Sequence, residues 1–362
     1  MTISYDKFGL KEVINASGKM TILGVSKVSE NVLAAQRFGG EHFFEMSELH
    51  VQTGAYLAKL LEVEDAQIVS SASAGIAQSV AAVIGEGSVY HAYHPYTERI
   101  TKREIILPKG HNIDYGTPVE VMVGQGGGKV VEAGYANMCS AAHIEMMITA
   151  DTAAILYIKS HHTVQKSMLT VAEAAAVAKK HQLPLIVDAA AEEDLYKYSK
   201  AGADLVIYSG AKAIEGPSSG LVIGKGKYIE WIRLQGKGIG RAMKIGKDNI
   251  LGLTQALEDR LKDGSETGDS MKKRLAPFID AINQIEGLKA TVVQDGAGRD
   301  IYRASVKVLE RSAKDVIAAL KEENPAIYTR EYQANNGIIE FDIRAVNEEE
   351  MNKIVTRLKA IM

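Results

Sequence analysis

The chain has 362 residues, and its 42 basic and 45 acidic side chains give a formal net charge of −3. This length favours a large domain with a smaller second one, and the near-balanced charge argues against a general nucleic-acid-binding surface. The one cysteine, Cys139, excludes an intrachain disulfide and a cysteine zinc cluster. The sequence shows neither a signal-peptide pattern nor a long uncharged apolar run, so we expect a soluble cytoplasmic protein with no membrane partner.

The predicted elements, taken in chain order, change character twice. Residues 1–27 form an irregular arm, and helical spacing of apolar residues then predicts helices over 28–38 and 47–62. From about residue 66, apolar runs such as AAILYI, PLIVDA and DLVIYS alternate with alanine-rich helical stretches. This alternation is typical of βαβ units in a mainly parallel sheet.

Beyond about residue 226 the pattern is typical of a smaller α+β domain. Helices and strands are predicted over 248–263, 269–285, 288–294, 301–308, 312–322, 337–343 and 347–360. The predicted fold class is therefore α/β, with a large domain on a mainly parallel sheet and a smaller α+β C-terminal domain. We place an N-terminal arm and helix at 1–45, the large domain at 46–247 and the small domain at 248–362.

A carboxylate and a lysine follow two of the apolar runs. Asp188 ends PLIVD, and DLVIYSGAK leads to Ser209 and Lys212. Because ligands of an open parallel sheet bind beyond the carboxyl ends of its strands, Asp188 and Lys212 can meet at one edge. This pair suits pyridoxal 5'-phosphate (PLP): the lysine amine binds its aldehyde, and the aspartate keeps its pyridine nitrogen protonated. The alternative interpretation is a surface lysine and a helix-capping aspartate.

The loop SSASAG, which follows the apolar run AQIVS, predicts a phosphate site. Its small residues open a helix, and the backbone N–H groups at a helix start bind phosphate. The candidates are Ser71, Ser73, Ala74 and Gly75, and Ser209 can reach the same phosphate. Close packing of small residues is the alternative. However, a PLP enzyme of the aspartate-aminotransferase fold requires a phosphate loop, a carboxylate and a lysine in this order.

Seven segments resemble the selenocysteine-synthase-like branch of fold-type-I PLP enzymes. They are INASGKMTILG at 14–24, the small-residue loop at 71–75, PKGHNIDYG at 108–116, VVEAG and YAN within 130–137, IVDAA at 186–190, SGAKAIEGPSSGLVIGK at 209–225 and RAMKIGKDNILGL at 241–253. The resemblance implies the aspartate-aminotransferase-like fold, PLP bound covalently to Lys212, and Asp188 beside the pyridine nitrogen. It also implies a homodimer or higher homo-oligomer, because enzymes of this fold complete each active site with a second subunit.

Within this branch, HNIDYG and KSHHTVQKSM are similar to an ammonia-lyase that acts on a phosphorylated 2-amino sugar acid. We therefore expect a carbon–nitrogen lyase in which Lys212 removes the α-proton of a small phosphorylated amino-acid substrate before the C3 hydroxyl leaves. Compared with selenocysteine synthases, the chain lacks the N-terminal tRNA-binding domain and has AAAEED where they are glycine-rich. These departures argue against nucleic acid as a partner. The alternatives are a transferase, racemase or aldolase of the same branch, or a non-catalytic sugar-phosphate-binding protein.

Several histidines are candidates for the site. His111, after EIILP, is the predicted residue over the PLP ring, and His91 and His94 compete for that role. His161 and His162 follow AAILYI on what we expect to be an extended segment, so their side chains should point to opposite sides. His162 is the predicted acid for the leaving hydroxyl, with Lys212 itself as the alternative, and His161 is a predicted substrate contact. No metal site is predicted, because no further cluster at ligand spacing accompanies them.

Basic residues predict two anion sites for the substrate. Lys237, Arg241 and Lys244 lie among glycines, where cations and flexible N–H groups can hold the distal phosphate. Arg344, after GIIEFDI, can bind the substrate carboxylate through two parallel hydrogen bonds. The alternatives are a solvated basic helix start and an ordinary strand-end arginine.

Overall fold

The structure is a computed structural model that describes residues 3–296 and 298–362, so the first two residues of the predicted arm lie outside the described residues. The chain divides into two compact units. The large unit comprises residues 28–263, and the small unit combines residues 1–27 with residues 264–362. The small unit is therefore built from both ends of the chain.

These boundaries differ from the predicted ones at two helices. Helix α2 (Glu30–Glu41), predicted as part of the arm, and helix α12 (Lys247–Asp263), predicted as part of the small domain, both belong to the large unit. They pack closely against each other, since a Cβ on Gly39 would lie 2.7 Å from the Cα of Asp248. The sequence pattern marks each helix but not the partner against which it packs.

The large unit is built on a seven-stranded sheet in the order β2-β8-β7-β6-β5-β3-β4. Its strands are β2 (Asp65–Val69), β3 (Glu104–Pro108), β4 (Lys129–Ala133), β5 (Thr152–Ile158), β6 (Leu185–Asp188), β7 (Leu205–Ser209) and β8 (Gly220–Gly224). Strands β3 to β7 run parallel, whereas β8 is antiparallel to both β7 and β2. The predicted α/β class with a mainly parallel sheet is confirmed.

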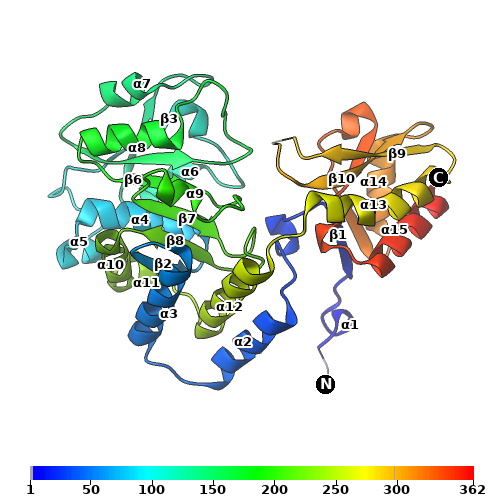
Figure 1. Ribbon diagram of the computed structural model, residues 1–362, viewed down its shortest axis with the longest axis horizontal. Helices are drawn as coiled ribbons and strands as arrows, with labels where there is room; N and C mark the ends of the chain where they lie inside the picture. The colour runs from blue at the N-terminus through cyan, green and yellow to red at the C-terminus, as the bar shows by residue number, and fades with distance from the viewer. Residues whose placement is uncertain (1–2, 297) are drawn as a thin grey trace. The chain divides into compact units, whose positions relative to one another are not determined.

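Helices cover both faces of this sheet (Figure 1). The helices of the large unit besides α2 and α12 are α3 (Met46–Leu61), α4 (Ala72–Gly85), α5 (Val89–Tyr93), α6 (Val119–Gln125), α7 (Ala141–Met146), α8 (Val171–Lys180), α9 (Lys197–Lys200), α10 (Gly226–Leu234) and α11 (Ile239–Ala242), with short 3-10 turns η2 (Lys109–His111) and η3 (Gln235–Lys237). Helices α4, α6 and α10 pack on one face, and α3, α7, α8 and α12 on the other. Side chains alternate along a strand, so Leu156 of β5 packs in the core on the α4 face, and the next residue, Tyr157, packs in the core on the opposite face.

The small unit contains a three-stranded antiparallel sheet, in the order β12-β10-β9, and a parallel pair of β1 and β11. Its elements are α1 (Tyr5–Phe8), β1 (Val13–Ala16), η1 (Thr21–Leu23), α13 (Gly268–Asn283), β9 (Leu288–Gln294), β10 (Tyr302–Val308), α14 (Ala313–Glu322), β11 (Ala326–Thr329), η4 (Ala334–Asn336), β12 (Ile338–Phe341), η5 (Ile343–Ala345) and α15 (Glu348–Ile361). Val13 pairs with Ala326, so the predicted irregular arm contains a strand. Ile14 of this strand is fully buried in the core of the small unit.

Candidate active site

The carboxyl ends of the parallel strands gather polar residues at one edge of the large sheet. Asp188 is the last residue of β6, and Ser209 is the last residue of β7. The end of β2 reaches the same edge because β8 runs antiparallel between β2 and β7: Ser209 pairs with Gly220, and Gly220 pairs with Val69. The loop that follows Val69 therefore lies at the edge that carries Asp188 and Ser209.

Asp188 is a buried carboxylate with a positive neighbour. Burial raises its pKa to about 6, while a hydrogen bond from the N–H of Ala190 and the charge of Lys212 act in the opposite direction. Lys212 lies three residues beyond β7, in a turn where its N–H donates to the carbonyl of Ser209. The charge of Lys212 acts on Asp188, so the two predicted residues lie near each other. This is expected because β6 and β7 are adjacent parallel strands.

The loop between β2 and α4 presents a helix start. Ser71 caps α4 by accepting a hydrogen bond from the N–H of Ala74 at 3.0 Å. Of the N–H groups of the first turn, which have no intrahelical partner, those of Ala72 and Ser73 remain for an anion. A Cβ on Gly75 would lie 2.9 Å from Ile207, so Gly75 faces the sheet and its role is close packing. Among the four predicted loop residues, Ser73 is therefore best placed to bind phosphate.

Tyr115 is a site residue that the sequence analysis missed. Its hydroxyl lies 3.2 Å from the Oγ of Ser73. Burial raises the pKa of Tyr115, and the charge of Asp188 contributes in the same direction. The phenol thus lies near both the phosphate loop and the carboxylate. Tyr115 falls within the segment PKGHNIDYG, but nothing in the local pattern indicates which residue of that segment faces the site.

The histidines do not all occupy the predicted positions. The ring of His111 is fully buried, with Nε2 3.2 Å from the carbonyl of Val164 and an edge-to-face contact with Tyr157. Burial lowers its pKa to about 4. Such a ring has no open face for a cofactor, so the structure contradicts the predicted stacking role. Of the two alternatives, His91 is fully buried beside Gly85, and His94 is exposed with its ring against Tyr90.

His161 and His162 lie on a turn rather than on an extended segment. Their rings are 3.9 Å apart, so the prediction that they point to opposite sides is wrong. Burial and the charge of Lys212 both lower the pKa of His162. His162 is therefore a neighbour of Lys212, as the predicted acid for the leaving group has to be.

The basic segment after α10 lines a cavity of about 650 Å³ beside β2. Arg241 and Lys244 are among its lining residues, whereas Lys237 on η3 is exposed and is not. The structure thus groups two of the three cations predicted to hold the distal phosphate.

Arg344, predicted to bind a carboxylate, lies in the small unit beside a buried aspartate. Its Nε and Nη2 donate to the two carboxylate oxygens of Asp342 at 2.9 and 2.8 Å. Asp342 also accepts from the Nε of Arg303 at 3.0 Å. Gly18 approaches this pair so closely that a Cβ there would lie 3.0 Å from Asp342. The guanidinium of Arg344 is consequently held in a fixed orientation.

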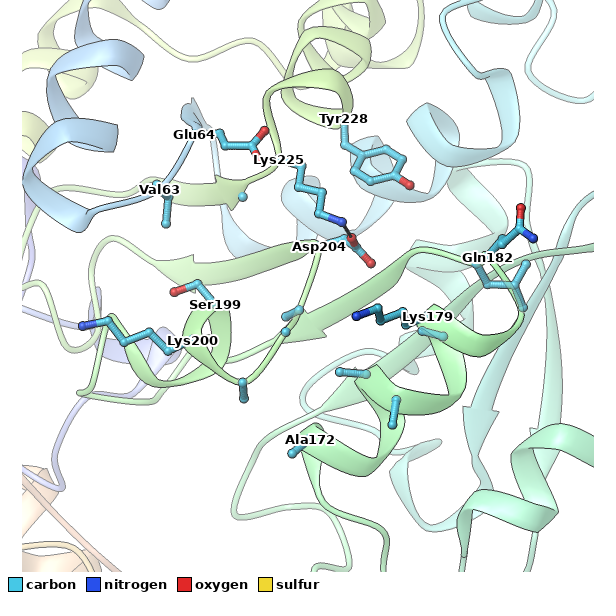
Figure 2. Close-up of a pocket in the computed structure, with 18 of the residues that line it drawn as sticks. Val63, Glu64, Ala172, Lys179, Gln182, Ser199, Lys200, Asp204, Lys225 and Tyr228 are labelled. Atoms are coloured by element: carbon cyan, nitrogen blue, oxygen red, sulfur yellow. Dashed lines mark ion pairs between the residues drawn. The ribbon is translucent and has the colours of Figure 1, made fainter.

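Another cavity, of about 810 Å³, lies at the opposite end of the parallel strands. Figure 2 shows Lys225 reaching Asp204, with 2.5 Å between Nζ and Oδ1. Asp204 precedes β7 and Gly224 ends the antiparallel β8, so both belong to the amino end of the parallel strands. This cavity does not contain Asp188 or Lys212, and volume alone does not identify the site.

Two features are absent from residues 3–296 and 298–362. Within them, no group of three or more His, Cys, Asp or Glu side chains is arranged to hold a metal ion. None of the helices in that part of the chain is long and apolar enough to cross a membrane.

The donor set at the carboxyl edge fits PLP. Asp188 offers a carboxylate for a protonated ring nitrogen, and Lys212 offers an amine within its electrostatic reach. The start of α4 adds N–H groups, and Ser73 adds a hydroxyl, for a phosphate. Each of these groups is of the type that one part of the cofactor needs.

Comparison with known proteins gives consistent results. The model of the family described as "SelA: L-seryl-tRNA selenium transferase" matches residues 50–275. The D-glucosaminate-6-phosphate ammonia lyase of Salmonella typhimurium is 45% identical over 361 residues, which cover 99% of this chain and 97% of that protein. The 5'-C-glycyluridine monooxygenase-decarboxylase of a Streptomyces species is 34% identical, over 100% of this chain and 92% of that protein.

Solved structures agree with these sequence matches. A structure of D-glucosaminate-6-phosphate ammonia-lyase has a TM-score of 0.94 and 44% identity, and covers 100% of this chain and 98% of that chain. A serine palmitoyltransferase from S. paucimobilis with bound PLP has a TM-score of 0.58 at 13% identity, and covers 97% of this chain and 87% of that chain. The second likeness concerns the fold alone, and it confirms the predicted PLP fold type I.

Proposed function

Since the chain belongs to the SelA family of PLP enzymes, we propose that it is an ammonia-lyase that converts D-glucosaminate 6-phosphate into 2-keto-3-deoxy-6-phosphogluconate and ammonia. The main support is the 45% identity to such an ammonia lyase over nearly the whole of both chains. Asp188 and Lys212 at one sheet edge supply the groups that this carbon–nitrogen lyase chemistry needs.

The cofactor would be held by residues of the large unit. Lys212 would bind it covalently, Asp188 would face the pyridine nitrogen, and the N–H groups of Ala72 and Ser73, together with Ser209, would bind the phosphate. PLP, when bound, withdraws electrons from the substrate's α-carbon and so makes its proton acidic. The raised pKa of Asp188 supports this arrangement, because a buried carboxylate gains strongly from a protonated ring nitrogen beside it.

The side chains of this chain would then move two protons. The amine of Lys212 removes the proton from C2 of the substrate. The bond between C3 and its hydroxyl breaks, and the hydroxyl leaves as water after taking a proton from His162 or from the ammonium of Lys212. Because the pKa of His162 is lowered, little of it is protonated at neutral pH, which favours Lys212 as the donor. The released enamine takes up water and yields the keto acid and ammonia.

Substrate positioning and assembly complete the proposal. Arg344 would bind the carboxylate, His161 would contact the substrate, and a basic segment would hold the distal phosphate. The enzyme would work in the cytoplasm as a homodimer or higher homo-oligomer. A monooxygenase-decarboxylase is the second candidate, because a relative with that activity is 34% identical over the full chain. Both activities would use Lys212 and Asp188.

An absorbance spectrum before and after borohydride reduction tests the cofactor assignment. We expect an absorbance band of the PLP–lysine link that disappears on reduction, and peptide mapping should place the reduced cofactor on Lys212. The Lys212→Ala variant should lack the label. Ammonia release from D-glucosaminate 6-phosphate then distinguishes the lyase from a monooxygenase, which would consume dioxygen instead. A label on another lysine would refute the site.

A further inference from the structure

The cavity beside β2 combines positive charge with an absence of carboxylates. It lies between α3, the edge strand β2, α10 and the segment that follows α10. Four cations line it, namely Arg233, Arg241, Lys244 and Lys247, and none of the described residues that line it is an aspartate or a glutamate. In a chain with a net charge of −3, such a cavity concentrates positive potential locally.

The four cations differ in what they already bind. Arg233 is neutralised by Asp65 through two hydrogen bonds of 2.6 and 2.8 Å, and Lys247 donates to the carbonyls of Gly39 and Gly40. Arg241 and Lys244, by contrast, are exposed, and their side chains form no hydrogen bond or ion pair among the described residues. These two side chains are the ones available to an anionic ligand.

A partly buried network behind the cations presents further hydrogen-bond donors. The Nε of Arg233 donates to the Oε1 of Gln67 at 3.1 Å, which fixes the orientation of the Gln67 amide. The Nε2 of Gln67 then donates to the Nδ1 of His50 at 2.9 Å. His50 must therefore carry its proton on Nε2. Burial and the charge of Arg233 lower its pKa, so this neutral tautomer persists at physiological pH.

Gln78 adds an amide to the wall of the cavity. This α4 side chain is 6% exposed, lines the cavity and makes no side-chain hydrogen bond among the described residues. Its amide offers both a donor and an acceptor to a polar group in the cavity. Its position beside Arg241 and Lys244 indicates where the ligand's polar group lies.

We propose that this cavity binds the phosphate group of a phosphorylated small molecule and that, in the proposed reaction, it holds the distal phosphate of the substrate. This step rests on the proposed function. Val69 lines the cavity and lies in register with Gly220 and Ser209, two strand spacings, or roughly 10 Å, from the strand that leads to Lys212. The long side chains of Arg241 and Lys244 shorten that separation for a six-carbon substrate.

The test compares phosphorylated and unphosphorylated ligands on the PLP-loaded enzyme. Calorimetry would measure binding of inorganic phosphate, D-glucosaminate 6-phosphate and D-glucosaminate, and ammonia release would give KM and kcat. In a double variant, Arg241→Ala with Lys244→Ala, two charge-assisted contacts are lost. We therefore expect the affinity for inorganic phosphate and for D-glucosaminate 6-phosphate to fall about tenfold or more. Affinity for D-glucosaminate and the absorbance of the bound cofactor should stay unchanged.

Two further variants make the test specific. Gln78→Glu places a carboxylate of nearly the same shape in the cavity and should abolish phosphate binding by charge repulsion. Lys129→Ala removes an exposed cation from β4, which is the outermost strand on the side of the sheet away from β2. This change should leave every measurement unchanged. The Lys129 variant therefore controls for a general loss of positive charge.

The outcomes distinguish a failure of the phosphate-site proposal from a failure of the proposed reaction. If the double variant loses PLP, the cavity serves the cofactor's phosphate, and the assignment to substrate is overturned. Equal weakening of D-glucosaminate and its 6-phosphate would also overturn it. If the wild-type enzyme releases no ammonia but still needs Arg241 and Lys244 to bind D-glucosaminate 6-phosphate, the proposed reaction fails and the phosphate site stands.

Discussion

Two buried carboxylates, Asp188 and Asp342, show how a single residue's surroundings decide its role. Burial raises the pKa of Asp188 to about 6, whereas the hydrogen bonds and charges of Arg344 and Arg303 overcome burial and hold the pKa of Asp342 at about 2. Asp342 is a stable anion at any ordinary pH. Asp188 carries a charge that its site tolerates poorly until a cation joins it.

Asp188→Asn should stabilise the cofactor-free protein at pH 8. Because the pKa of Asp188 is higher in the folded protein than the ordinary value of 3.8, the folded state binds the extra proton, and its contribution to stability disappears as the pH rises through 6. Two pKa units correspond to about 3 kcal/mol as an upper bound. Thermal unfolding of both proteins at pH 4 and pH 8 measures this, and the gain should appear only at pH 8.

The same variant should be nearly inactive in the presence of PLP. Loss of a preorganised charge at a catalytic centre typically costs about 100-fold or more in rate. A variant that is more stable without cofactor yet inactive with it would show that the charge of Asp188 is retained for function. Unchanged ammonia release would refute its role.

Asp342→Asn should destabilise the protein by about 3 kcal/mol or more, because it leaves Arg303 buried with one partner lost. The pKa of Asp342 is depressed, so the wild-type contribution is complete above pH 4 and is lost as the pH falls towards 2. Urea unfolding at pH 7 gives the magnitude. Glu349→Gln, which removes one partner of an exposed pair with Lys353, is the control and should have little effect.

At this scale, prediction from sequence succeeded where the reasoning was local. The neighbourhood of Asp188 and Lys212 follows from two strand ends one crossover apart. The burial of His111 does not, because Tyr157 and Val164, which enclose it, come from a different segment. The turn at His161 could not be read from the apolar run before it.

The elements at the site depend on glycine where the backbone of one meets another. Gly220 opens β8 beside the loop that precedes α4, and a Cβ on it would lie 2.4 Å from the backbone carbon of Ser71. Gly75 likewise allows α4 to approach β7, since a Cβ on it would lie 2.9 Å from the side chain of Ile207. The N–H groups that we assign to phosphate binding are thus positioned by the contact between a helix and a sheet.

Gly220→Ala should weaken PLP binding, because the added methyl group displaces the start of α4. We expect the apparent affinity for PLP, followed by absorbance, to fall about tenfold or more, since a shift below 1 Å is enough to impair charge-assisted hydrogen bonds. Gly124→Ala in α6 is the matched control: a Cβ there meets nothing within 4 Å, so affinity should be retained. Equal effects of the two changes would contradict the packing argument.

Elements that depend on local interactions were predicted more accurately than pairings between distant segments. Helices such as α12 and α13 were placed within about two residues, because apolar periodicity and capping are local signals. The pairing of β1 with β11 was missed, since each strand has only four residues and its partner lies at the other end of the chain. The antiparallel direction of β8 leaves no mark in its own sequence.

At the scale of the whole molecule, the fold class and the order of the site segments could be predicted, but the boundaries of the units could not.

The proposed assembly is also a property of this scale. On the large unit, Phe43 is 99% exposed and Phe38 is 51% exposed. Exposed aromatic rings of this size are typical of surfaces that another protein covers.

Sedimentation should give a mass of at least twice the 39.1 kDa of one chain. Phe43→Ser should shift the equilibrium towards the single chain at low concentration, because it removes an aromatic ring from the proposed contact. Lys129→Ala again serves as the control. A single-chain mass for the wild-type, PLP-loaded protein would refute the proposed assembly.

The origin of the small unit in both chain ends has a consequence for synthesis. At about 5–20 residues per second, the ribosome needs roughly 15–60 seconds to proceed from β1 to its partner β11. The large unit, which is continuous from residue 28 to residue 263, can fold during that interval. Ile14 and Ala16, both fully buried in the folded protein, have no strand partner until β11 has been synthesised. A segment that leaves the ribosome among the first is therefore among the last to fold.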